Sequence, residues 1–152
     1  MSLRIFRGIQ LFWGYFIAFG ALVGFGMMVY DPTGVAFQMD PLLPQLREAF
    51  PFLSFMFGDF ICSAFALLLV NGVTNIISIY LIHKHNEYDA LSGMICGLIL
   101  LAWIVVEFYI WGFSGLSVAY GIFAAFQIAN AVIFLKIKKS SAHSGRTTYS
   151  NN

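Results

Sequence analysis

Residues 90–111 read ALSGMICGLILLAWIVVEFYIW and carry a single charged side chain, that of Glu107. A run of this length reaches the ~20 apolar residues with which an α-helix crosses the ~30 Å hydrocarbon core of a bilayer. Helix is the default conformation in lipid because each backbone N–H and C=O there has to be bonded within its own segment. The stretch therefore predicts a membrane-spanning helix.

Three further apolar runs predict three more spans. They cover residues 8–30, 52–82 and 115–135. The run 52–82 is too long for a perpendicular crossing, so we expect it to start in the interface or to tilt. A transmembrane barrel would need many strands of about ten residues with alternating polarity, and that pattern is absent from the sequence. The sequence predicts an all-α protein, a four-helix transmembrane bundle formed by residues 1–139.

The composition indicates lipid as the surrounding of this chain. Apolar residues make up 60% of it and charged residues 10%, whereas soluble globular domains carry about 25% charged residues. So few charges could hardly cover a water-facing surface. The net charge is +1, which predicts no nucleic-acid partner. The lipid bilayer is the partner that the composition indicates.

The basic residues indicate the orientation in the membrane. Those near the predicted ends of the spans are Arg4, Arg7, Lys84, Lys136, Lys138, Lys139 and Arg146. With four crossings all of these lie on one side, whereas the opposite side holds only Arg47. The positive-inside rule then predicts that both termini are cytoplasmic. We expect the protein in the cytoplasmic (inner) membrane of a bacterium.

Two segments lie outside the predicted spans. The outer loop, residues 31–51, contains four prolines and many apolar side chains, and residues 44–50 are expected to form a short helix within it. Residues 140–152 are rich in Ser, Thr, Asn and Gly and lack apolar periodicity. This composition predicts a flexible polar tail.

Two carboxylic acids lie within the predicted spans, and intramembrane acids are candidates for a functional site. They are Asp59 and Glu107. Trp103 shares a helical face with Glu107, and Tyr120 of the last span is expected at a similar depth. These four residues are candidates for binding a ligand or ion. Alternatively, Asp59 is a helix N-terminal charge in the headgroup zone, and Glu107 reaches out to the interface or bonds one neighbour.

Four amide side chains are predicted to form a buried polar layer deeper in the bundle. They are Asn71, Asn75, Gln127 and Asn130. Such amides usually bond across helices, worth about 0.6–2 kcal/mol each in membranes. The alternative is that they line a ligand cavity or a water path.

The sequence contains no metal-ligand spacing, phosphate loop or nucleophile motif. It predicts no metal site and no cofactor. The leading hypothesis is a non-enzymatic protein that binds or passes a small solute or ion, or serves as a membrane partner subunit. The competing hypothesis is an intramembrane enzyme acting on a lipid-like substrate, which needs Glu107 and Asp59 or Tyr120 in one cavity.

Small residues recur at four-residue spacing along the predicted spans, as in Gly20 and Gly24 or Gly93 and Gly97. Small side chains allow two helices to approach closely. We expect them to serve packing within the bundle. A homo-oligomer formed through the first span is the alternative.

Residues 97–112, GLILLAWIVVEFYIWG, resemble the third span of small uncharacterised four-span bacterial membrane proteins. In these a tryptophan is followed four positions later by a polar residue, and here that pair is Trp103 and Glu107. The similarity covers this helix and the general layout. It implies four spans, with no particular activity and no catalytic residues.

Overall fold

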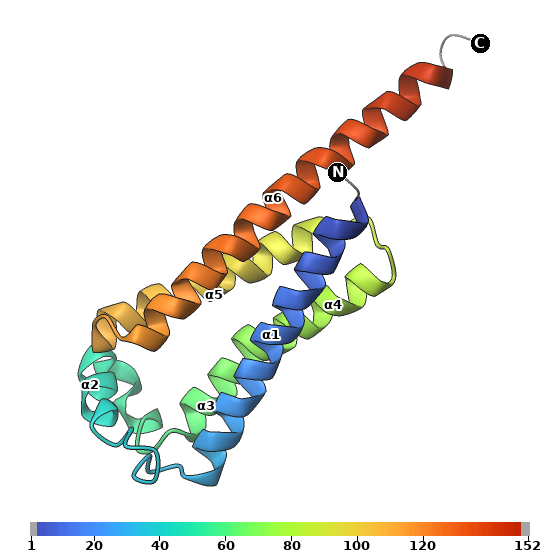
Figure 1. Ribbon diagram of the computed structural model, residues 1–152. Coiled ribbons are helices and arrows are strands. Elements are labelled where there is room, and N and C mark those ends of the chain that lie inside the picture. Colours follow the sequence, from blue (N-terminus) through green and yellow to red (C-terminus); the bar gives the residue numbers. More distant parts are fainter. Residues whose placement is uncertain (1–2, 150–152) are drawn as a thin grey trace.

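The computed structural model describes residues 3–149, and side chains for residues 3–140. The protein is 83% helical, and the described residues contain no strand. In chain order the elements are α1 (Leu3–Tyr30), α2 (Leu42–Ala49), the 3-10 helix η1 (Pro51–Met56), α3 (Ile61–Leu67), the π-helix η2 (Leu68–Val73), α4 (Thr74–His83), α5 (Asp89–Trp111) and α6 (Gly115–Tyr149) (Figure 1). Since α3, η2 and α4 follow one another without a break, they form one helix.

Four helices are long and apolar enough to cross a membrane, as the sequence predicts. They are Leu3–Tyr30, Ile61–His83, Asp89–Trp111 and Gly115–Ser140. Large apolar side chains such as Phe12, Phe19 and Tyr109 are 59%, 68% and 79% exposed on their outer faces. An apolar exterior on every long helix is what a lipid surrounding requires.

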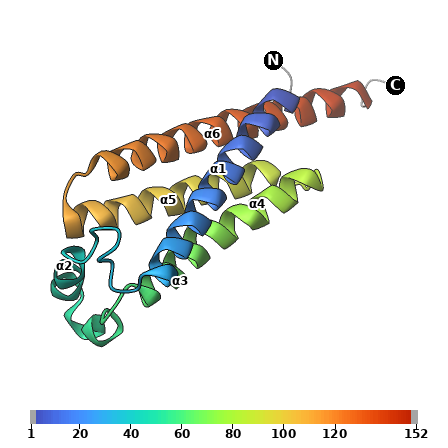
Figure 2. The same cartoon turned by 60° about the horizontal axis from the view of Figure 1, so that its bottom comes forward.

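The long helices form two pairs that converge at one end. One pair is α5 with α6, joined by a tight turn at Gly112, where φ is +71°. The other is α1 with the helix made of α3, η2 and α4. The pairs meet at the end that holds both termini and diverge toward the opposite end, where α2 lies across the gap (Figures 1 and 2). The two termini therefore lie at the same end of the bundle.

The second spanning helix begins at Ile61, nine residues later than the run 52–82 suggests. Pro51 starts a 3-10 turn whose side chains are exposed, with Phe52 at 95%. The backbone N–H of Phe60 then bonds the carbonyl of Pro32 at 2.9 Å, which ties this segment to the loop after α1. A count of apolar residues cannot separate such a turn from the helix that follows.

The outer loop and the C-terminal segment also depart in detail from expectation. The short loop helix is present, but α2 begins at Leu42 rather than at Pro44. The last helix continues to Tyr149 through residues where the composition predicts a flexible tail. Once a helix is nucleated, each added residue gains a backbone hydrogen bond, so a helix can continue into polar sequence. The flexibility of residues 140–152 stays a prediction.

Glycines allow the helices to approach closely inside the bundle. A Cβ added at Gly97 would lie 2.7 Å from Cγ1 of Ile128, and one at Gly20 would lie 2.6 Å from the hydroxyl of Tyr120. A Cβ at Gly93 would overlap the side-chain amide of Gln10, which is itself only 1% exposed. These small residues make internal contacts, whereas the homo-oligomer stays a prediction.

We predict that Gly93→Ala lowers the free energy of unfolding by about 1–3 kcal/mol, the usual cost of overpacking. The buried amide of Gln10 has no room to move without losing its hydrogen bond to the carbonyl of Asp89. Thermal unfolding in detergent measures the effect. Gly26→Ala is the matched control, because no atom lies within 4 Å of a Cβ there. Equal melting temperatures for the two variants would contradict this close approach.

Candidate functional site

A cavity of about 310 Å³ lies beneath α2, between α1, η1, α3 and α5. We call it the α2 cavity. Its walls are mostly apolar and include Met28, Leu46 and Trp111. Glu107 is the one charged side chain among the described residues that line it. A mostly apolar pocket with one charged group is the usual form of a small-molecule site.

Two hydrogen bonds hold the carboxylate of Glu107. The indole Nε1 of Trp103 donates to Oε1 at 2.6 Å, and the hydroxyl of Ser117 donates to Oε2 at 2.8 Å. Ser117 is held in turn by Ser114, whose hydroxyl lies 2.8 Å away and accepts the backbone N–H of Ser117. A carboxylate accepts about four hydrogen bonds in total, so Glu107 keeps acceptor capacity for a further partner.

The partner of Glu107 differs in part from the sequence-based expectation. Trp103 lies beside Glu107 as predicted, one turn away on the same helix. Ser117 takes the position in the last span that the sequence assigns to Tyr120. The two residues are three positions apart on α6, about one turn. The sequence feature that could have indicated this contact is the pair of serines, Ser114 and Ser117, that follows Gly112.

Tyr120 lines a second cavity, of about 200 Å³, that lies deeper between α1, η2, α5 and α6. We call it the central cavity. Met28 and Trp103 line both cavities, so these two side chains form the shared wall. Glu107 does not line the central cavity, and Tyr120 does not line the α2 cavity.

Asp59 lies outside both cavities and precedes the spanning helix. Its Oδ1 accepts the backbone N–H of Ile61 at 2.9 Å. This is the helix N-terminal role that the sequence left open as the alternative. Asp59 does not line the cavity that Glu107 lines.

The predicted layer of four amides divides into two parts. The amide of Gln127 donates to Oδ1 of Asn75 at 3.2 Å, and Asn75 donates to the backbone carbonyl of Asn71 at 2.8 Å. Asn130 lies apart and donates to the backbone carbonyl of Phe6 at 3.1 Å. The side-chain amide of Asn71 is buried in the π-helix η2, and neither its nitrogen nor its oxygen has a partner among the described residues.

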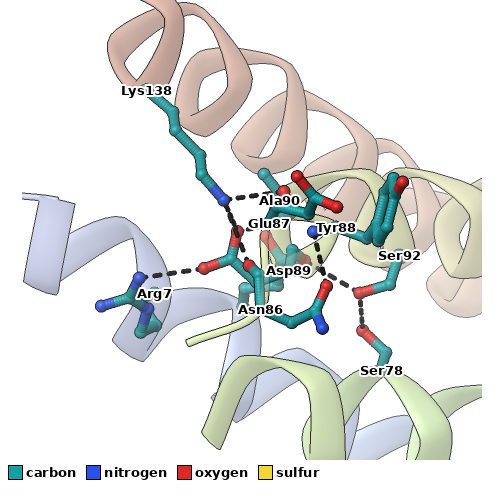
Figure 3. Close-up of polar contacts among 10 residues, drawn as sticks. Arg7, Ser78, Asn86, Glu87, Tyr88, Asp89, Ala90, Ser92 and Lys138 are labelled. Carbon is teal, nitrogen blue, oxygen red and sulfur yellow. Dashed lines mark hydrogen bonds and ion pairs between the residues drawn. The ribbon is translucent and has the colours of Figure 1, made fainter. Parts of the chain in front are cut away.

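A buried ion cluster closes the end of the bundle that holds the termini (Figure 3). The carboxylate of Asp89 is fully buried, and its oxygens lie 2.9 Å from Nη2 of Arg7 and 2.6 Å from Nζ of Lys138. Lys138 also donates to the carbonyls of Asn86 and Glu87. One carboxylate thus joins α1, α5 and α6 where the two helix pairs converge.

Sequence reasoning missed Asp89 because it stands in a polar turn at the start of a span. Two sequence features could have indicated the ion pairs of Asp89. It stands at the N-terminus of a predicted span, and it lies on the same side of the membrane as Arg7 and Lys138. Charges on one side of a membrane protein are usually solvated, so the pattern did not distinguish a buried cluster from a surface one. The pairing depends on how the three helices pack.

Comparisons of the chain with protein-family models, with curated proteins and with solved structures found no match.

We predict that Asp89→Asn destabilises the fold by about 3 kcal/mol, because it leaves two partly buried cations without their counter-charge. The melting temperature in detergent measures this loss. Glu87→Gln is the matched control, since that neighbouring side chain is exposed and only its backbone carbonyl accepts from Lys138. If both variants had the melting temperature of the wild type, the cluster would have no role in holding the helices together.

Proposed function

We propose that this small polytopic membrane protein binds a small amphipathic solute in the α2 cavity, with an amine or similar hydrogen-bond donor at Glu107. The observation that carries the proposal is the oriented carboxylate of Glu107, the one charged residue among the described lining residues of a mostly apolar cavity. Trp103 and Ser117 hold both of its oxygens. A cationic head would pair with the carboxylate while an apolar body covers the surrounding side chains.

The geometry supports binding better than passage. The two cavities lie in the half of the bundle where the helix pairs diverge. At the converging end the Asp89 cluster and the buried side chain of Gln10 join the helices. A solute path would have to cross this ion-paired end. Binding from the α2 side requires no such opening.

An intramembrane enzyme is supported less well. That hypothesis requires Asp59 or Tyr120 beside Glu107 in one cavity. Asp59 lines neither cavity, and Tyr120 lines the central one. Ser117 contacts Glu107, but it donates to the carboxylate and forms part of its support.

We also propose that the ends of the chain face the cytoplasm, in the inner membrane of a bacterium. The support is the charge distribution: Arg7 and Lys138 lie at the end that holds both termini. Arg47 lies at the opposite end, where it donates to the carbonyls of Phe57 and Gly58. Basic residues gather on the cytoplasmic side of membrane proteins.

Glu107→Gln is expected to weaken binding of hexylammonium roughly tenfold while leaving binding of neutral hexan-1-ol unchanged, because the variant loses charge but keeps shape. Trp103 and Trp111 line the cavity, so their fluorescence reports binding in detergent. Asp59→Asn serves as the matched control and is expected to bind as the wild type does. Equal affinity of wild type and Glu107→Gln for hexylammonium would remove Glu107 from the site.

The orientation predicts the behaviour of reporter fusions in a bacterial host. A fluorescent protein fused after Asn152 is expected to fold and emit, because it stays in the cytoplasm. Alkaline phosphatase inserted after Gly34, in the loop at the opposite end, is expected to be active, because that enzyme needs the oxidising periplasm. The reverse pattern of activities would contradict the proposed orientation.

A further inference from the structure

Asn71 lines the central cavity, and its side-chain amide is buried without a partner among the described residues. The residue is 2% exposed, and neither Nδ2 nor Oδ1 makes a hydrogen bond within the part of the chain that the structure describes. A buried polar group without a partner costs about 1–3 kcal/mol. In a membrane no bulk water lies nearby to reduce this cost.

The fold does not need this amide. The hydrogen bond from Asn75 goes to the backbone carbonyl of Asn71, which any residue would supply. The neighbouring polar contact, from Gln127 to Asn75, also leaves the Asn71 side chain out. A leucine at this position would keep these contacts and remove the cost. A polar group kept at a cost to stability is typical of a functional site.

The cavity beside Asn71 has room for a small molecule. It holds about 200 Å³, and the small residues Gly20, Ala21 and Gly24 of α1 form part of its wall. The other polar side-chain groups among the described lining residues are the hydroxyl of Tyr120 and the indole N–H of Trp103, which already donates to Glu107. The π-helical turn η2 carries Asn71 into this wall, and π-helical turns recur at functional sites.

We propose that the central cavity binds a neutral amphiphile whose hydroxyl group pairs with the Asn71 amide. A free amide offers one acceptor and two donors, and an alcohol supplies both a donor and an acceptor in return. The described lining residues are uncharged, so an ionised head would lose its hydration without a counter-ion. The site goes beyond the amine site proposed at Glu107, because Glu107 does not line this cavity.

Tryptophan quenching by two matched probes tests the proposal. Bromine quenches indole fluorescence on contact, and Trp103 lines the cavity. The probes are 6-bromohexan-1-ol and 1-bromohexane, compared at equal concentrations within the micelle. We expect the alcohol to quench wild-type protein with a roughly fivefold higher apparent affinity, the effect of about one net hydrogen bond.

Asn71→Leu is expected to bring that preference to about one while melting at or above the wild-type temperature. Asn130→Leu is the matched control, because it removes a partnered amide at the other end of the bundle. We expect it to melt lower and to keep the preference. Ala21→Leu fills the cavity and is expected to weaken quenching by both probes.

Two results would overturn the proposal. They are equal quenching of the wild type by the two probes and a preference that survives Asn71→Leu. Equal quenching together with a lower melting temperature for Asn71→Leu would mean that the amide is structural or holds water only. Equal quenching of the wild type by the two probes overturns the proposal even if a variant fails to fold. Because Trp103 lines both cavities, two variants separate the sites: the preference is expected to be lost in Asn71→Leu and kept in Glu107→Gln.

Discussion

The arrangement of the helices depends on the ion pairs that the buried carboxylate of Asp89 makes. In a low-dielectric interior an ionised carboxylate is tolerated only when cations and hydrogen-bond donors surround it. Arg7 from α1 and Lys138 from α6 supply the cations, and the backbone N–H of Ala90 adds a bond of 2.7 Å. Because these groups come from separate helices, their ion pairs hold three helix ends together at one point.

The open end of the bundle follows from this constraint. The helix pairs meet at Asp89 and separate toward α2, which covers the gap with Leu43 and Leu46 buried beneath it. The two cavities occupy the region between the pairs, with Met28 and Trp103 between them. One end of the molecule thus supplies rigidity, and the other supplies space.

The polar groups in the two cavities are held in different ways. Two donors orient Glu107 before any ligand binds. Binding therefore costs less conformational entropy of this side chain. Asn71 has no such support, since neither polar atom of its side chain has a partner among the described residues. Apolar surroundings of low dielectric strengthen a hydrogen bond made there. The same surroundings make the unpartnered amide of Asn71 costly. Glu107 has donors in place, whereas the Asn71 amide has none, so the two polar groups differ in what a partner would add.

The sequence by itself determined the number of long apolar helices, their apolar outer faces and the short helix of the outer loop. Length and hydropathy are local properties of the sequence, and they decide which segments lipid can surround. It also identified Glu107 with Trp103, since four-residue spacing places both on one helical face. Only the tertiary structure decided that Ser117 bonds Glu107, that Asp59 precedes its span, and that Asp89 is buried. These depend on where each helix begins, how it is rotated and which neighbour it meets. Such relations join residues far apart in the chain, and hydropathy carries no information about them.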